Sequence, residues 1–105
     1  MLYLYLGVSD KAISALLIKK GQVDRPVYYV SKVLQGPEMH YPFTVKVALA
    51  LLNASKKLRP YFQAHSIIVL MDQQLRNILQ KPKCSGRLTK WSIELSKYDV
   101  QFQPR

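Results

Sequence analysis

Apolar and polar positions alternate along the first third of the chain and then change to a helical spacing. Leu2–Ser9 alternates three leucines with two tyrosines, so this run predicts a strand that is apolar on both faces and covered on both sides. After a turn signal at 9–11, Ala12–Lys19 predicts its hairpin partner. Val27–Val33 is rich in aromatic and β-branched residues and predicts a third strand.

The clearest helical pattern lies at Thr44–Leu58. Apolar residues follow a spacing of three and four in two stripes, which together cover more than half of the circumference. This pattern predicts a helix that lies between a sheet and another helix, and Pro60 is expected to end it. The two stripes are Val45, Ala48, Leu49 and Leu52, and Val47, Leu51, Ala54 and Leu58.

The second half of the chain predicts two further strands and two further helices. Ser66–Met71 and Asp99–Phe102 read as strands, and Gln73–Leu79 and Arg87–Ser96 read as helices. A right-handed crossover through the first helix sets the fourth strand parallel to the first. The whole pattern predicts one α/β domain that spans residues 1–105.

Length and composition narrow the class of protein. The chain has 105 residues, of which 49% are hydrophobic, so it forms one domain with a packed core and not a disordered segment. Its longest apolar helical stretch, Val45–Leu52, is too short to cross a bilayer, and we expect no membrane partner. Cys84 is the single cysteine, which excludes an internal disulfide, favours a reducing compartment and is read as a plain loop thiol.

The charge balance points to a polyanionic partner. Sixteen lysines and arginines face six acids, and the formal net charge is +10. An excess of this size in a small domain favours nucleic acid, although a merely solvated surface is the alternative. The six acids are Asp10, Asp24, Glu38, Asp72, Glu94 and Asp99.

Several fragments, in this order, resemble one family. Together they are similar to the RNase H-like domain that follows the reverse transcriptase in gypsy-type LTR retrotransposon polyproteins, above all those of plant elements. The similarity covers nearly the whole chain, and it implies a mixed five-stranded sheet, with a three-strand antiparallel meander plus two parallel strands and helices on its faces. It also implies that the domain is C-terminally truncated here. The fragments are VSDKAISALLIKK, RPVYYVSKVL, HYPFTVKVALALL, KKLRPYF, IIVLMDQQLRNILQKP and SGRLTKWSIELSKYDVQFQPR.

The resemblance implies a chemistry that depends on carboxylates. Active members of the family cut the RNA strand of an RNA–DNA hybrid with two Mg²⁺ ions, one activating water and the other stabilising the leaving oxygen. Mg²⁺ requires hard oxygen ligands, so Asp and Glu side chains must hold it.

Two of the family's ligand positions lack a carboxylate in this chain. The first catalytic Asp lies two residues before a Ser that matches Ser9, so its position is Gly7. The central helix motif begins at Tyr41, and its two Glu positions fall on Val45 and Val47, with Val47 at the metal-ligand position. Asp10 lies near the first position but is read as a solvated turn residue.

One ligand position retains its acid. The family's third carboxylate matches Asp72 at the end of the fourth strand, where the competing interpretation is an N-cap for the following helix. The family's fourth carboxylate follows the final strand, in a short C-terminal motif that residues 1–105 do not reach. A site with one ligand of four does not hold two metal ions, so we expect no resident cofactor, and Mg²⁺ only if the nuclease were active.

The favoured hypothesis is a catalytically inactive tether between polymerase and nuclease domains of a Pol polyprotein. Such a tether helps to hold the RNA–DNA template–primer through phosphates, without reading sequence. Lys56, Lys57 and Arg59 are equally explained as a solvated helix end, and Tyr28, Tyr29 and Trp91 are assigned to the core rather than to base stacking. The basic residues assigned to nucleic-acid binding are Lys11, Lys32, Lys46, Lys56, Lys57, Arg59, Arg87 and Lys90.

Two alternatives stay open at this stage. The chain is either a hybrid-cutting two-metal nuclease, as in the active family, or a decayed retroelement fragment without a present role. The expected location is intracellular, in a cytoplasmic virus-like particle or in the nucleus.

Overall fold

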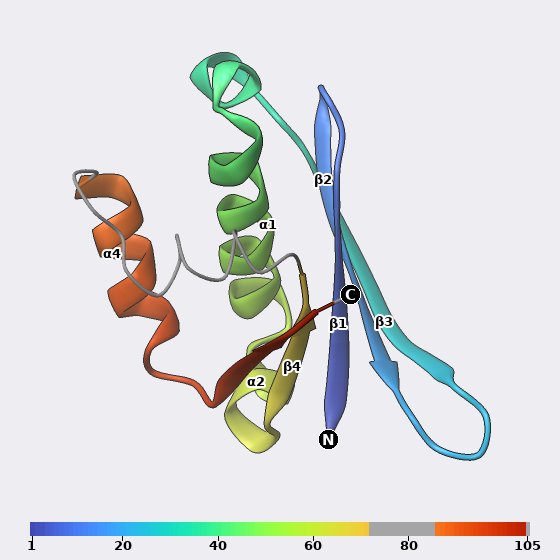
Figure 1. Ribbon diagram of the computed structural model, residues 1–105. Coiled ribbons are helices and arrows are strands. Elements are labelled where there is room, and N and C mark those ends of the chain that lie inside the picture. The colour runs from blue at the N-terminus through green and yellow to red at the C-terminus, as the bar shows by residue number, and fades with distance from the viewer. Residues whose placement is uncertain (72–85, 105) are drawn as a thin grey trace.

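The computed structural model describes residues 1–71 and 86–104, with nine elements in those ranges. The predicted helix at Gln73–Leu79, Asp72 and Cys84 lie outside the described residues. The elements, shown in Figure 1, are β1 (Leu2–Val8), β2 (Ala12–Lys19), β3 (Arg25–Val33), the 3₁₀ helix η1 (Gly36–His40), α1 (Phe43–Lys57), α2 (Arg59–Ala64), β4 (Ile67–Leu70), α4 (Gly86–Leu95) and β5 (Val100–Gln103).

The five strands form one mixed sheet in the order β3-β2-β1-β4-β5. The pairs β1/β2 and β2/β3 are antiparallel, whereas β4 runs parallel to β1 and β5 runs parallel to β4. The predicted meander and the two predicted parallel strands are therefore confirmed. The crossover from β3 to β4 through α1 and α2 is what brings β4 beside the central strand β1.

The helices lie on one face of the sheet (Figure 1). Leu2, Leu4 and Leu6 point to that face and are buried against α1 in the core, together with the alternate residues of β2. On the other face Tyr3 and Tyr5 are half-buried, and no described helix covers them. The predicted covering of this strand on both sides is therefore wrong for the described residues. In contrast, all four residues of β4 are buried.

Helix α1 is placed between the sheet and α4, as its two apolar stripes predict (Figure 1). As predicted, α1 ends shortly before Pro60, at Lys57, but the proline also lies in the first turn of a further helix that was not predicted. The N–H of Leu58 donates to the carbonyl of Ala54 at 2.8 Å, and a second short helix, α2, begins at Arg59. Proline fits the first turn of a helix, where its missing N–H has no partner to lose.

Two tyrosines of β3 are at the surface, which corrects their assignment to the core. Tyr28 is 53% exposed and Tyr29 is 60% exposed, because β3 is an edge strand and its outer side has no neighbour. The ring of Tyr28 lies 6.5 Å from that of Tyr61. Trp91 is half-buried and packs against the core, as predicted.

An ion pair ties η1 to β3. The ammonium of Lys32 lies 3.1 Å from Glu38 Oε2, and the N–H of Gln35 donates to Glu38 Oε1 at 3.2 Å. Burial acts to raise the pKa of Glu38, but these hydrogen bonds and the charge of Lys32 outweigh it and lower the pKa. The pair therefore stabilises the fold at neutral pH, and this contribution is lost as the pH falls through the pKa of Glu38 in the folded protein.

Replacing Glu38 with glutamine is expected to have a small, pH-dependent effect. Because both partners are partly exposed, the variant should lose about 0.5 kcal/mol of unfolding free energy at neutral pH and almost nothing at acid pH. Urea unfolding at both pH values measures this difference. An equal loss at both pH values would show that the glutamate acts by packing and not by charge.

Candidate functional site

The end of β1 and the start of α1 lie close together in the structure. The ammonium of Lys46, on α1, donates to the carbonyl of Asp10, in the turn after β1, at 3.3 Å. Lys46 is only 8% exposed, so its side chain crosses the interior to make this bond. The bond joins the turn after β1 to the first turns of α1. Gly7 alternates with the buried leucines of β1, so its side-chain position lies on the face of the sheet opposite to α1 and Val47.

At position 7 the neighbouring strand occupies the space that a side chain would need. Gly7 pairs with Ser14 across β1 and β2, and a Cβ added to Gly7 would lie 2.5 Å from Ser14 Oγ. Carbon and oxygen atoms that are not bonded do not approach this closely. A side chain at this position therefore requires Ser14 to move, and glycine itself offers no metal ligand.

At position 47 the side chain belongs to the hydrophobic core. Val47 is 5% exposed and lies in the core cluster with Leu4, Leu6 and Ile13. Helix α1 contains no acidic residue along its length. A valine in this environment contributes packing and no coordination.

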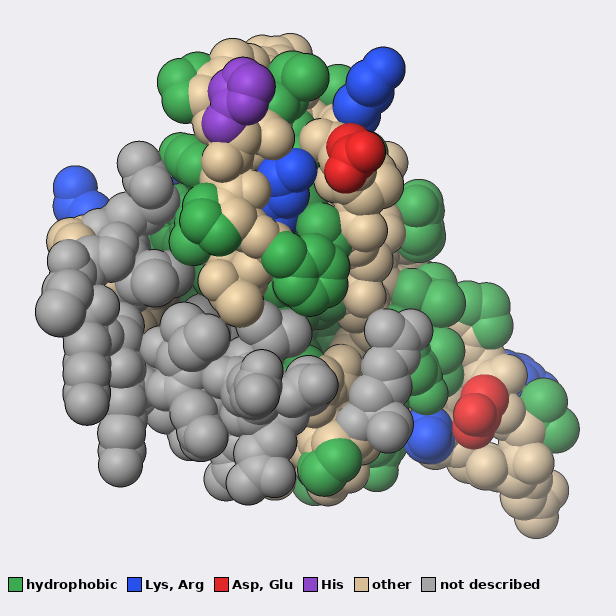
Figure 2. Space-filling view, turned by 45° about the horizontal axis from the view of Figure 1, so that its top comes forward, with side chains coloured by type: hydrophobic (Ala, Val, Ile, Leu, Met, Phe, Trp, Pro, Cys, Tyr) green, Lys and Arg blue, Asp and Glu red, His purple; other side chains and the backbone are tan. Residues whose placement is uncertain are grey.

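The acids of the described residues do not assemble into a metal site. Asp10 is exposed in the β1–β2 turn, where Ser9 closes the loop by accepting the N–H of Ala12 at 3.1 Å. In residues 1–71 and 86–104 no three Asp, Glu, His or Cys side chains gather closely enough to hold a metal ion. Figure 2 agrees: on the visible part of this face the acidic side chains stand apart from one another.

The basic residues predicted to bind nucleic acid differ in their surroundings. Lys32 is paired with Glu38, Lys46 is buried, and the side chain of Arg87 is not among those described. The others are exposed, but they do not share one location. Lys11 lies in the β1–β2 turn and Lys90 on α4, whereas the end of α1 and the start of α2 carry Lys56, Lys57 and Arg59.

Sequence reasoning did not single out four further exposed cations. Lys19, Lys20 and Arg25 belong to the β2–β3 hairpin, and Lys97 lies between α4 and β5. The strand register places this hairpin beside the start of β1, since Lys19 pairs with both Leu2 and Arg25. The predicted antiparallel meander already contained this information, because it puts the second turn at the end of the sheet where the chain begins.

The sequence matches a known family over most of its length. A sequence model of the family described as "RNase H-like domain found in reverse transcriptase" matches residues 1–98. The chain belongs to this family. Its membership agrees with the mixed sheet.

Two relatives of this RNase H-like domain come from Drosophila melanogaster. The chain is 30% identical over 95 residues to the "Retrovirus-related Pol polyprotein from transposon 297", and this alignment covers 90% of the chain and 9% of that protein. It is also 30% identical over 103 residues to the corresponding polyprotein from transposon opus, covering 95% of the chain and 10% of that protein. The RNase H-like chain therefore spans about a tenth of the length of these relatives.

Solved structures of a foamy virus protein share the fold. The foamy viral protease-reverse transcriptase in complex with double-stranded DNA superposes with a TM-score of 0.74 at 20% identity, over 99% of this chain and 23% of that one. The same viral protein in complex with an RNA/DNA hybrid gives a TM-score of 0.70 at 18% identity, over 99% of this chain and 15% of that one. No helix in the described part of the RNase H-like domain has the length and apolar character needed to cross a membrane.

Proposed function

We propose that this RNase H-like domain is catalytically inactive and serves as a tether that helps to hold an RNA–DNA template–primer within a Pol polyprotein. One observation carries the proposal. Both ligand positions that lie in the described residues have become packing positions, since Ser14 occupies the space at Gly7 and Val47 lies in the core.

The residues present do not fit the two Mg²⁺ ions of the active family. Divalent metal ions of this kind need several carboxylate oxygens to balance their charge. Of the positions considered, only Asp72 keeps a carboxylate, and it lies outside the described residues. No step of hydrolysis is therefore assigned to this chain, and we expect no resident metal.

Three observations support binding of nucleic acid through phosphates. The net charge is +10, and exposed cations occur at Lys11, Lys90 and the junction of α1 with α2. Two of the similar viral structures hold double-stranded DNA or an RNA/DNA hybrid. Phosphate contacts of this kind raise affinity without sequence preference and weaken as salt increases.

The wider setting is inferred from the relatives. Because the chain spans about a tenth of two Pol polyproteins, we infer polymerase and nuclease domains as its neighbours. From the order of the family fragments we further infer a gypsy-type element of plant origin. A cytoplasmic virus-like particle or the nucleus is the corresponding location.

The purified chain is expected to bind a labelled RNA–DNA hybrid and to leave the RNA intact in Mg²⁺ or Mn²⁺. Fluorescence anisotropy at several salt concentrations measures binding, and the same samples on a denaturing gel report cutting. The expected result is affinity that falls steeply with salt, because each phosphate contact releases a counterion.

Two other results would contradict this function in different ways. RNA that is cut by the wild-type chain and remains whole with Asp72→Asn would identify a working nuclease. Absence of binding at low salt would leave a decayed fragment as the better description. A double-stranded DNA of the same length serves as the matched ligand, because phosphate contacts alone do not select the hybrid.

A further inference from the structure

The strand register defines one end of the sheet, which we call the β1-start end. Lys19, Leu2, Ile67 and Val100 lie in one row across β2, β1, β4 and β5. The N–H of Leu2 donates to the carbonyl of Ser66 at 3.3 Å, and the N–H of Ile67 donates to the carbonyl of Asp99 at 2.9 Å. The segments that lead into β1, β4 and β5 therefore meet at this end, together with the β2–β3 hairpin.

Cations outnumber acids at the β1-start end. Among the described residues, the acids there are Asp24, Glu94 and Asp99. The opposite end holds Lys11, but there Lys32 is paired with Glu38 and Lys46 is buried. Within residues 1–71 and 86–104, the positive charge is thus concentrated at the β1-start end, whose cations are Lys19, Lys20, Arg25, Lys56, Lys57, Arg59 and Lys97.

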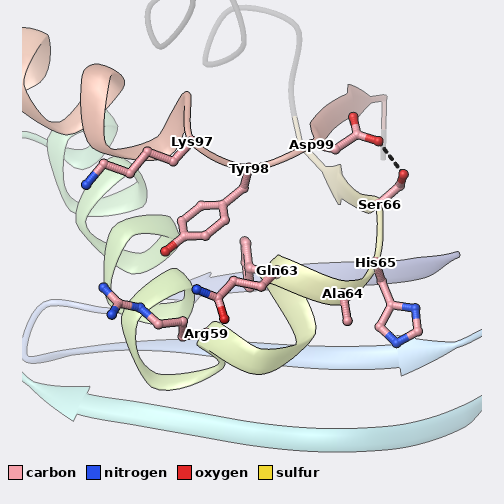
Figure 3. A pocket seen from close by; sticks show the side chains of 9 residues that line it. Arg59, Gln63, Ala64, His65, Ser66, Lys97, Tyr98 and Asp99 are labelled. Carbon is pink, nitrogen blue, oxygen red and sulfur yellow. Dashed lines mark hydrogen bonds between the residues drawn. The ribbon is translucent and has the colours of Figure 1, made fainter.

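An open pocket lies at this end between α2 and the connection from α4 to β5. Its volume is about 590 Å³, and Arg59, Gln63, Lys97 and Tyr98 are among its lining residues. Figure 3 shows the guanidinium of Arg59, the amide of Gln63, the hydroxyl of Tyr98 and the ammonium of Lys97 gathered on the same side of the pocket. All four groups carry N–H or O–H donors.

Two structural features position these side chains: helix α2 and the contact of Tyr98 with the core. Arg59 and Gln63 are four residues apart on α2, so they lie on the same face of that helix. The ring of Tyr98 packs edge-on against buried Phe62, with ring centres 5.6 Å apart, and the N–H of Tyr98 donates to the carbonyl of Leu95 at 3.2 Å. The core thus fixes the aromatic ring and leaves its hydroxyl at the pocket.

The two acids near the pocket do not neutralise this group of donors. Asp99 accepts a hydrogen bond from the hydroxyl of Ser66, and Figure 3 shows both at the opposite side of the pocket. Glu94 lies 3.4 Å from the ammonium of Lys97, but the side chains of this pair are 36% and 60% exposed, respectively. An exposed pair of this kind is weak, so Lys97 is free to exchange Glu94 for a phosphate oxygen.

We propose that this pocket binds a phosphate group of the nucleic-acid backbone, at the end of the sheet opposite the lost metal-ligand positions. This inference rests on the proposed function and specifies where the strand is held. A phosphodiester has only acceptor oxygens, and Arg59 can engage two of them at once. The excess of positive charge along this end suits any polyanion. We choose nucleic acid over an acidic peptide because solved structures that share the fold hold double-stranded DNA or an RNA/DNA hybrid.

Two double variants that remove equal charge test this placement. Arg59→Gln with Lys97→Gln removes two cations from the pocket, and Lys20→Gln with Arg25→Gln removes two exposed cations of the β2–β3 hairpin, outside the pocket. With the labelled hybrid, the pocket variant should bind about tenfold more weakly or worse, and its logarithmic salt slope should fall by about two. The control variant should change affinity by less than about threefold.

Tyr98→Phe gives a test that leaves the charge unchanged. Loss of one hydroxyl donor should weaken binding by about twofold to fivefold without changing the salt slope, because no counterion is involved. Thermal unfolding of every variant checks that the fold is intact. A wild-type affinity in Tyr98→Phe would show that the hydroxyl does not reach the phosphate and would overturn the pocket geometry.

The remaining outcomes separate this inference from the function on which it rests. Equal losses in the pocket and control variants would overturn the pocket while leaving nucleic-acid binding in place. Polyglutamate that displaces the hybrid as well as an unlabelled hybrid does would assign the pocket to acidic peptides. Absence of binding by the wild-type chain would refute the proposed function, and the pocket inference with it.

Discussion

Replacing Val47 with glutamate is expected to lower the free energy of unfolding by about 3 kcal/mol or more. Val47 is 5% exposed and surrounded by apolar side chains, so a carboxylate there loses its hydration and gains no cation. The ammonium of Lys46 is engaged with the carbonyl of Asp10. Urea unfolding at neutral pH measures the loss.

The pH dependence of this variant identifies the cause. Burial raises the pKa of an introduced carboxyl, so its penalty should shrink as the pH falls and the group becomes neutral. Val45→Glu is the matched control, because position 45 is on the same helix but half-buried, and its loss should be much smaller. Full stability of Val47→Glu at neutral pH would show that position 47 accepts a charged side chain. Equal losses in the two variants would show that the greater burial of position 47 is not the cause.

Replacing Gly7 with alanine is expected to cost about 1–2 kcal/mol of unfolding free energy in the presence of Ser14. The added Cβ would lie 2.5 Å from Ser14 Oγ but 3.9 Å from Ser14 Cβ. The conflict therefore involves the hydroxyl alone. In a chain that already carries Ser14→Ala, the same change should be neutral or stabilising, because alanine reduces the freedom of the unfolded chain.

A double-mutant cycle measures this coupling. The wild-type chain, the two single variants and the double variant are compared by chemical unfolding, and an interaction energy of about 1 kcal/mol or more is expected. Ala12→Gly with Ser14→Ala provides a control cycle within β2. Gly7 is unchanged in this cycle, so no added Cβ meets the hydroxyl of Ser14. Simple additivity in the Gly7 cycle would mean that Ser14 turns away without cost.

The periodicity of the sequence predicted most of the fold. The alternation in Leu2–Ser9 and the double stripe in Thr44–Leu58 each correspond to an element that differs by a residue or so at its ends. Both signals come from residues that the core requires to be apolar. The mixed sheet then follows from the short turns, which give antiparallel pairs, and from the long crossover, which gives a parallel pair.

The incorrect predictions concern residues whose burial is not determined by the local sequence pattern. Tyr28 and Tyr29 have the side chains of a core strand, but whether a strand is at the edge depends on the order of the whole sheet. Pro60 was a correct end signal for α1, but the same proline also lies in the first turn of α2. The sequence alone did not indicate this second role.

The candidate site also has one part that the sequence predicted and one part that it did not. The family motif was enough to assign Gly7 and Val47 to the ligand positions, because motif spacing is a local property. The pocket was not predictable, since Arg59 and Tyr98 are far apart in sequence and meet only through the parallel pairing of β4 with β5. The place of Lys46 on α1 was predicted, but its burial was not. That burial depends on the turn after β1, which the side chain contacts.

The lack of space between Gly7 and Ser14 has a consequence for how this sequence can evolve. We expect an acid at position 7 to cost less once position 14 has lost its hydroxyl, so the order of the two substitutions would matter. Position 47 adds a second barrier, because a single glutamate there is expected to unfold the chain before any metal is available to balance it. If the domain is inactive as proposed, a return to carboxylates at both positions would pass through less stable chains, and the loss of the ligands would be hard to reverse.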